Sequence, residues 1–136
     1  MALVALLAAL VPQASHAQED SPAVMRGLEL ENAGKYREAA QQFRQALHVA
    51  PTPGALLGLE RVYAELGASD SMLAPLDTLI ALHPREPLYR SVQLRTLQIL
   101  RRDDALRAAF EGWVRQVPRD PAPYREYTRI LLQLGR

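Results

Sequence analysis

Prolines recur along this chain at an almost constant interval, and this spacing constrains the fold more than any other feature. Pro51, Pro84 and Pro118 are 33 and 34 residues apart. The same two steps relate three further columns: Leu30, Tyr63, Leu97 and Leu131; Phe43, Leu76 and Phe110; and the pairs Ala33-Gly34, Leu66-Gly67, Leu100-Arg101 and Leu134-Gly135. Repeats of this length are typical of arrays in which each unit packs only on its neighbours.

Each repeat has the pattern of two helices joined by a short turn. A proline stands where each first helix should begin, and there its missing N–H costs nothing. These starts are Ser21-Pro22, Thr52-Pro53, Glu86-Pro87 and Asp120-Pro121. Side chains suited to capping the helices precede three of the prolines. Glycines suited to a left-handed turn should end three first helices, and they are Gly34, Gly67 and Gly135.

The pattern predicts seven helices and no strand. Their expected ranges are 21–33, 36–49, 53–66, 70–82, 87–100, 104–116 and 121–134. Pro75 falls inside the fourth range, where an interior proline would break a hydrogen bond. A helix start near Ser71 would place Pro75 in the first turn and remove most of that cost. Asp103 stands at the expected N-cap of the sixth helix.

The first unit resembles the tetratricopeptide repeat (TPR) in residue type and spacing. The matching residues are Gly27, Gly34, Tyr36, Glu38, Ala39, Phe43, Ala46, Leu47 and Pro51. The second unit departs from the pattern, because Met72 and Leu79 replace small alanines. The third unit has Arg101 in place of glycine and Trp113 in place of a small residue. We therefore expect wider helix spacing in the third unit.

This resemblance implies an all-α, right-handed superhelical solenoid of about three and a half repeats over residues 18–136. The units would cover about 20–52, 53–86 and 87–120, with a partial unit at 121–136. First helices would line the concave side, where such solenoids usually bind partners. The expected repeat core consists of Tyr36, Ala39, Phe43, Tyr63, Phe110 and Trp113.

Arginines occupy one concave place in three successive first helices. Arg61, Arg95 and Arg129 are each 34 residues apart, and Arg125 stands one turn before the last. Such a ladder could hold the carboxylates of an extended acidic segment through paired hydrogen bonds. Ordinary helical pairing is the alternative, because Glu65 follows Arg61 by four residues and Glu126 precedes Arg129 by three. Arg95 has no such carboxylate within its own helix.

The N-terminal segment is expected to be a secretory signal rather than part of the fold. Residues 2–11 form an apolar run of ten residues, which is too short to span a bilayer. Pro12 ends the run, and Ser15-His16-Ala17 supplies the small residues of a cleavage site. No Lys or Arg follows Met1, and a buried N-terminal helix is the alternative. We expect residues 1–17 to be removed after export to a bacterial periplasm or beyond.

The sequence offers no recognisable catalytic, cofactor or metal site. It has no cysteine, and neither His48 nor His83 has a second ligand at helical spacing. No phosphate-binding loop, zinc-protease motif or nucleophile elbow is present. The net charge is +1, and glutamates are interspersed among the fifteen arginines, so nucleic acid is not an expected partner.

Two classes of function fit this sequence. The first is a non-enzymatic scaffold that holds a peptide or protein in the concave groove, with no cofactor and no stable membrane span. The second is the N-terminal repeat region of a longer envelope enzyme or assembly factor, whose catalytic or anchoring part lies beyond Arg136. The apolar last helix keeps the second class open, because a terminal repeat normally needs a polar outer face.

Overall fold

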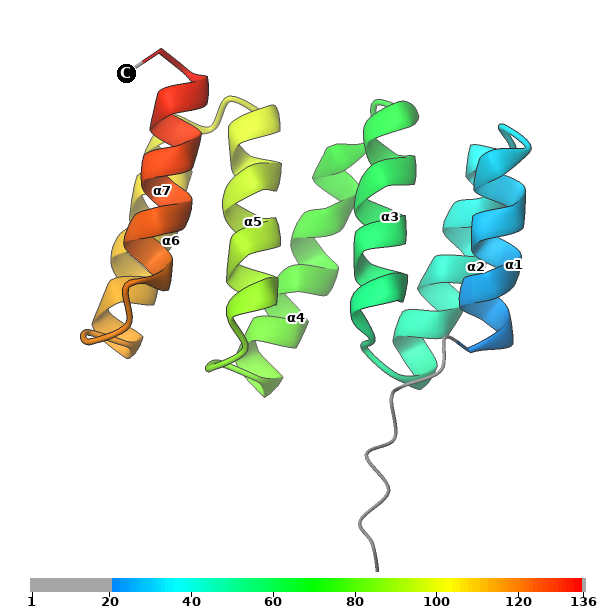
Figure 1. The fold of residues 1–136 in the computed structure, drawn as a ribbon, viewed down its shortest axis with the longest axis horizontal. Helices are drawn as coiled ribbons and strands as arrows, with labels where there is room; N and C mark the ends of the chain where they lie inside the picture. The colour runs from blue at the N-terminus through cyan, green and yellow to red at the C-terminus, as the bar shows by residue number, and fades with distance from the viewer. Residues whose placement is uncertain (1–20, 136) are drawn as a thin grey trace, which may run out of the picture.

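The computed structural model describes residues 21–135, which form seven α-helices and one short 3₁₀ helix, η1 (Figure 1). No strand occurs within this range. The predicted signal segment, residues 1–17, lies outside the described residues. The helices are α1 (Pro22–Asn32), α2 (Tyr36–Val49), α3 (Pro53–Glu65), η1 (Ser69–Met72), α4 (Leu73–Leu82), α5 (Pro87–Ile99), α6 (Asp103–Gln116) and α7 (Ala122–Gln133).

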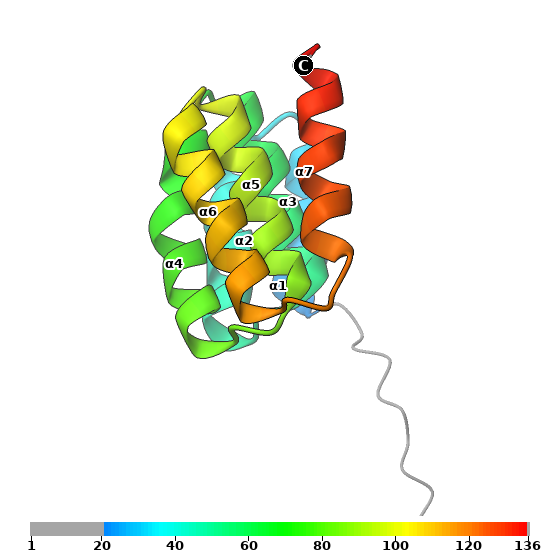
Figure 2. The ribbon, with the colours of Figure 1, turned by 90° about the vertical axis from the view of Figure 1, so that its left-hand side faces the viewer.

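The helices form two layers that run the length of the molecule. The first helices α1, α3, α5 and α7 stand side by side in one layer, and α2, α4 and α6 form the layer behind them (Figures 1 and 2). Each unit is a helical hairpin, and successive hairpins stack as an all-helical solenoid. This arrangement confirms the predicted fold class and its seven helices within the described range.

The helices begin where the capping residues predict. The Ser21 hydroxyl accepts a hydrogen bond from the Val24 N–H at 3.3 Å, and Thr52 accepts one from Ala55 at the same distance. Pro75 is the third residue of α4, because η1 precedes that helix, so it costs little. The prediction for α6 was one residue late: Asp103 is its first residue rather than its N-cap.

The turns that end the first helices confirm the repeat register. Gly34, Gly67 and Gly135 all have positive φ, at 73°, 64° and 70°. Arg101 occupies the equivalent place in the third unit and also has positive φ, at 53°. A side chain in this left-handed region costs about 1–2 kcal/mol relative to the ordinary helical region. The repeat geometry is therefore maintained in the third unit even though the residue that favours it is missing.

A phenylalanine ring between two glycines sets the spacing of the first two units. Phe43 in α2 is fully buried, and its ring lies against Gly27 of α1 and Gly58 of α3. A Cβ atom added to Gly27 would lie 2.7 Å from Cε1 of that ring, and one added to Gly58 would lie 2.4 Å away. Both distances are too short for real carbon atoms. The glycines therefore let three helices approach one aromatic ring.

The second hairpin is more open than the first. Among the described residues, no Cα of α4 comes within 8 Å of a Cα of α3, and α3 meets its hairpin partner through η1 instead. Met72 is buried and Leu79 half-buried where alanines would permit closer packing. The sequence predicts wider spacing in the third unit. There, however, α5 and α6 do approach within 8 Å, so the larger effect falls one unit earlier.

Most of the predicted core residues are buried, but two are not. Ala39, Phe43, Tyr63 and Trp113 are at most 6% exposed. Tyr36 and Phe110 are half-buried, and each packs against one of the two buried clusters. Phe110 stacks on Tyr127 of α7, with ring centroids 4.2 Å apart.

Replacing Gly58 with alanine tests the glycine contact. Gly58→Ala should destabilise the protein by about 1–3 kcal/mol, because the added methyl group overpacks the Phe43 ring. Gly112→Ala is the matched control, since a Cβ there would meet only Arg115 Nη2 at an ordinary 3.8 Å. It should stabilise α6 by about 0.5–1 kcal/mol. Urea unfolding measures both, and equal effects of the two substitutions would contradict this account of the packing.

Candidate interaction groove

The predicted arginine ladder lies between the first helices, but its members already bind carboxylates. Arg61 of α3 donates two hydrogen bonds to Glu31 of α1, at 2.7 and 2.8 Å. Arg95 of α5 donates two to Glu60 of α3, both at 2.8 Å. Both pairs have the two-pronged geometry that makes arginine–carboxylate contacts strong. Each therefore links one repeat unit to the next.

A third carboxylate continues this network into α7. Glu126 is only 8% exposed and forms ion pairs with both Arg129 and Arg95. Its Oε1 lies 3.5 Å from Arg95 Nη1, which is an ion pair rather than a good hydrogen bond. Arg95 thus holds carboxylates from both neighbouring first helices.

These contacts revise one expectation drawn from helical spacing and agree with the other two. Arg61 pairs with Glu31 of the preceding unit and not with Glu65 of its own helix. Arg95 has carboxylate partners, although none is in its own helix. The pairing of Arg129 with Glu126 is confirmed.

The network stabilises the protonated form of two arginines. The hydrogen bond to Glu31 raises the pKa of Arg61, and the hydrogen bond to Glu60 raises the pKa of Arg95, in both cases against the effect of burial. A ligand carboxylate would therefore have to displace an existing partner at either arginine. Arg125 differs, because its exposed side chain pairs with no carboxylate of the described residues.

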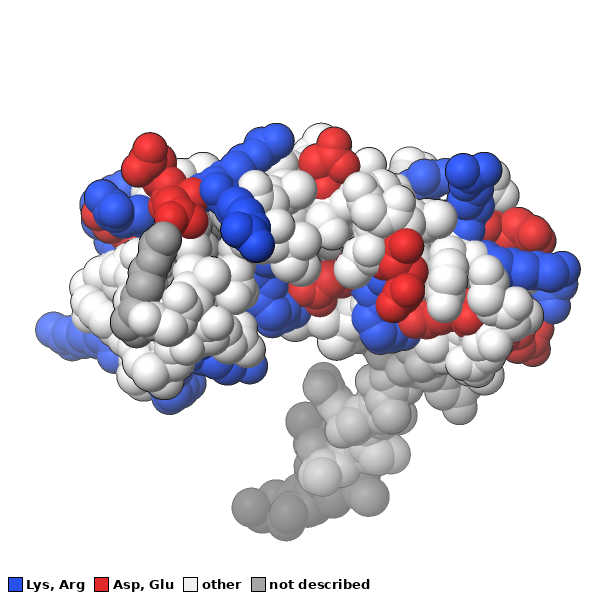
Figure 3. Space-filling view, turned by 90° about the horizontal axis from the view of Figure 1, so that it is seen from above, with Lys and Arg blue, Asp and Glu red and all other residues white. Residues whose placement is uncertain are grey.

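Charges of both signs are interspersed along the middle of the molecule when it is seen from above (Figure 3). In this view, basic side chains without acidic neighbours gather at the C-terminal end, on the side of the first helices (lower left in Figure 3). The central part of the surface seen from above thus offers little net charge to a partner.

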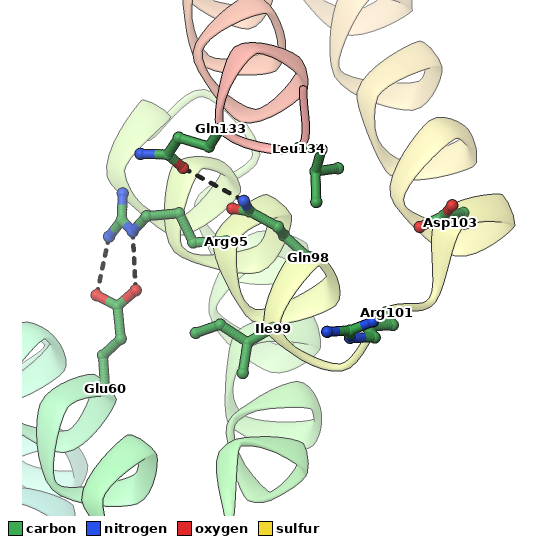
Figure 4. Close-up of a pocket in the computed structure, with 8 residues that line it drawn as sticks. All are labelled: Glu60, Arg95, Gln98, Ile99, Arg101, Asp103, Gln133 and Leu134. Carbon is green, nitrogen blue, oxygen red and sulfur yellow. Dashed lines mark hydrogen bonds and ion pairs between the residues drawn. The ribbon is translucent and has the colours of Figure 1, made fainter. Parts of the chain in front are cut away.

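An open hollow of about 830 Å³ lies between the C-terminal ends of α5 and α7 (Figure 4). It is lined by Glu60, Arg95, Gln98, Ile99, Arg101, Asp103, Gln133 and Leu134. Gln98 donates a hydrogen bond to Gln133 at 3.3 Å, which spans from α5 to α7. Ile99 is 53% exposed and Leu134 38% exposed, so two apolar side chains border this polar bridge.

The chemistry of this hollow suits a polypeptide. Side-chain amides both donate and accept hydrogen bonds, as backbone peptide groups require. The exposed isoleucine and leucine would gain from covering by an apolar side chain. Of the predicted ladder, only Arg95 lines this hollow. Sequence reasoning missed the glutamines and Ile99, although an apolar residue at the end of a polar first-helix face was a usable signal.

The described residues contain neither a membrane-spanning helix nor a cluster of metal ligands. None of the described helices is long and apolar enough to cross a bilayer. No group of three or more His, Asp or Glu side chains is placed to hold a metal ion within the same range.

Comparison with known proteins defines the class of fold. No protein-family model and no curated protein matches the sequence. The solved structures include a similar one, the crystal structure of a thermophilic TPR protein from Thermus thermophilus, with a TM-score of 0.57 and 23% sequence identity. The match covers 86% of this chain and 66% of that protein. This chain therefore has the fold of a TPR-like helical repeat protein.

Removing Arg95 should cost more stability than removing Arg61. The side chain of Arg95 is 29% exposed and that of Arg61 is 51% exposed. Arg95→Ala would leave Glu126 without an inter-helix partner, and it should destabilise the fold by about 1–3 kcal/mol. Arg61→Ala breaks a more exposed pair and should cost at most about 1 kcal/mol.

Thermal or urea unfolding of the two variants makes this comparison directly. Arg95→Lys is a further control, because lysine keeps the charge but cannot form the two-pronged contact. Equal stability of Arg61→Ala and Arg95→Ala would contradict the larger contribution assigned to Arg95.

Proposed function

We propose that this chain is a non-enzymatic scaffold that binds a peptide or protein segment on the side formed by its first helices. The observation that carries the proposal is the open hollow between α5 and α7 in a TPR-like solenoid. A solenoid presents an extended surface without needing to change shape, which suits the capture of an extended segment.

The lining of the hollow defines the preferred ligand. Gln98 and Gln133 would exchange their mutual hydrogen bond for bonds to the ligand backbone. Ile99 and Leu134 would take an apolar ligand side chain between them. Arg95 keeps its ion pair with Glu60, and the two side chains form one wall of the hollow. Because Glu60 already neutralises Arg95, this arginine should add little salt dependence to binding at the hollow.

Selection of peptides from a display library against the purified protein tests this proposal. Peptides that bind the wild type should bind Ile99→Asp at least about tenfold more weakly, since an apolar contact is replaced by a charge. Leu82→Asp is the matched control. Leu82 is the last residue of α4 as Ile99 is of α5, and it is 68% exposed. Selected peptides that bind both variants equally would place the binding surface elsewhere.

We also propose that the protein acts outside the cytoplasm. The apolar run at residues 2–11 and the small residues Ser15 and Ala17 support export followed by cleavage after Ala17. A scaffold in that compartment would meet envelope or extracellular proteins.

Mass spectrometry of the protein from its native host tests this proposal. The mature N-terminus should be Gln18. Ala17→Arg should leave the precursor uncleaved, because the peptidase requires a small residue there. An intact Met1 terminus in the cytosolic fraction would contradict export.

A further inference from the structure

The outer face of α7 carries an apolar stripe that the other described helices leave largely exposed, although the ring of Tyr124 contacts Phe110 of α6 edge-on. Tyr124 is 51% exposed and Leu132 is 71% exposed, with the exposed Thr128 between them at four-residue spacing. Residues spaced by four lie on one side of a helix. In Figure 1, α7 is the outermost helix at the C-terminal end of the solenoid.

Two of these positions are buried in earlier units. The place of Thr128 is taken by Gly27 in α1 and by Leu94 in α5, both of which are buried. The place of Tyr124 is taken in α3 by Leu56, which is fully buried. The remaining counterparts of these two positions are half-buried, so this part of α7 continues the surface along which helices of this solenoid pack. The counterparts of Leu132 are not buried in any earlier unit.

The opposite end of the molecule does not have this character. On α1, Arg26 and Glu29 form an exposed ion pair at 2.8 Å beside Met25. A polar surface of this kind closes a solenoid against further association. The apolar stripe is thus a property of the α7 end and not of both ends.

The charges beside the stripe identify the kind of partner. Arg125 and Arg129 follow one edge of it, and Glu126 between them pairs with both Arg129 and Arg95. Arg125 has no carboxylate partner among the described residues, so this edge keeps a net positive charge. A second copy placed antiparallel on α7 would bring the arginines of both copies to the same side, where like charges repel. An acidic partner meets no such repulsion.

We propose that the α7 stripe binds an amphipathic helix of a partner protein, with acidic residues along the flank that faces Arg125 and Arg129. The helix would lie on Tyr124, Thr128 and Leu132 and bury them. This site is separate from the hollow between α5 and α7 in which peptide binding is proposed. Each of the two binding proposals can therefore be correct without the other.

A stapled helical peptide serves as the probe. It has the sequence of α2, residues 36–49, because the apolar face of α2 already packs on first helices of this fold. A side-chain staple between the exposed positions 41 and 45 keeps it helical. The acidic form carries Arg37→Glu and Arg44→Glu, and the basic form carries Glu38→Lys alone. Fluorescence anisotropy measures the binding of each form to the full chain.

The acidic form should bind the wild type at least about tenfold more tightly than the basic form. Leu132→Ser and Arg125→Glu should each weaken its binding by about tenfold. Arg125→Glu should also favour the basic form instead. Leu82→Ser is the matched control, since Leu82 is 68% exposed in the last turn of α4, and it should leave binding unchanged.

Other outcomes overturn the proposal. Equal binding of the two forms, or binding that Leu132→Ser leaves unchanged, would exclude this site. A wild-type dimer in solution that Leu132→Ser converts to a monomer would show that a second copy covers the stripe. The Ile99→Asp variant should bind the acidic form as tightly as the wild type does. This outcome distinguishes binding at the α7 stripe from binding at the hollow.

Discussion

The contact of one aromatic ring with two glycines fixes how closely the units of this solenoid can approach. Phe43 fills the space that Gly27 and Gly58 leave open, so α1, α2 and α3 meet at a single ring. One unit further on, Met72 occupies the place of an alanine, and α4 stands away from α3. The close packing of the first hairpin is therefore not repeated in the second.

Ion pairs join the first helices all along the array, including the units where hydrophobic packing is looser. Arg95 contacts Glu60 on one side and Glu126 on the other, so one guanidinium connects α3, α5 and α7. Partly buried pairs of this kind contribute more than exposed ones, because water screens them less. Their role in the described structure is to tie repeats together.

Features that depend on local chemistry could be predicted from the sequence. The proline spacing located the helices, and the glycine column predicted the turn that Arg101 adopts against its own preference. The partners of the arginines could not be found in this way. Glu31 and Arg61 are thirty residues apart, so they meet only through the stacking of two units. The separations of 30 and 35 residues lie within four residues of the repeat interval, as expected for pairs between successive units.

The opening of the second hairpin was also beyond local reasoning. Met72 and Leu79 were recognised as large for their places, yet larger residues were present in the third unit as well. Which hairpin opens depends on how several side chains and η1 share one space, and that is a property of volumes in three dimensions. The hollow near Ile99 could not be predicted from local sequence either, because residues of several helices form it together.

The position of α5 has a mechanical consequence. Val92 belongs to the hydrophobic cluster of the first two units, and Leu94 belongs to the cluster around α6 and α7. Two residues along a helix correspond to about 200° of rotation, so the two side chains point to opposite sides. A single rigid rod thus takes part in two cores. Tension applied between the ends of the molecule would be transmitted through this helix. The two cores would bend relative to each other about α5.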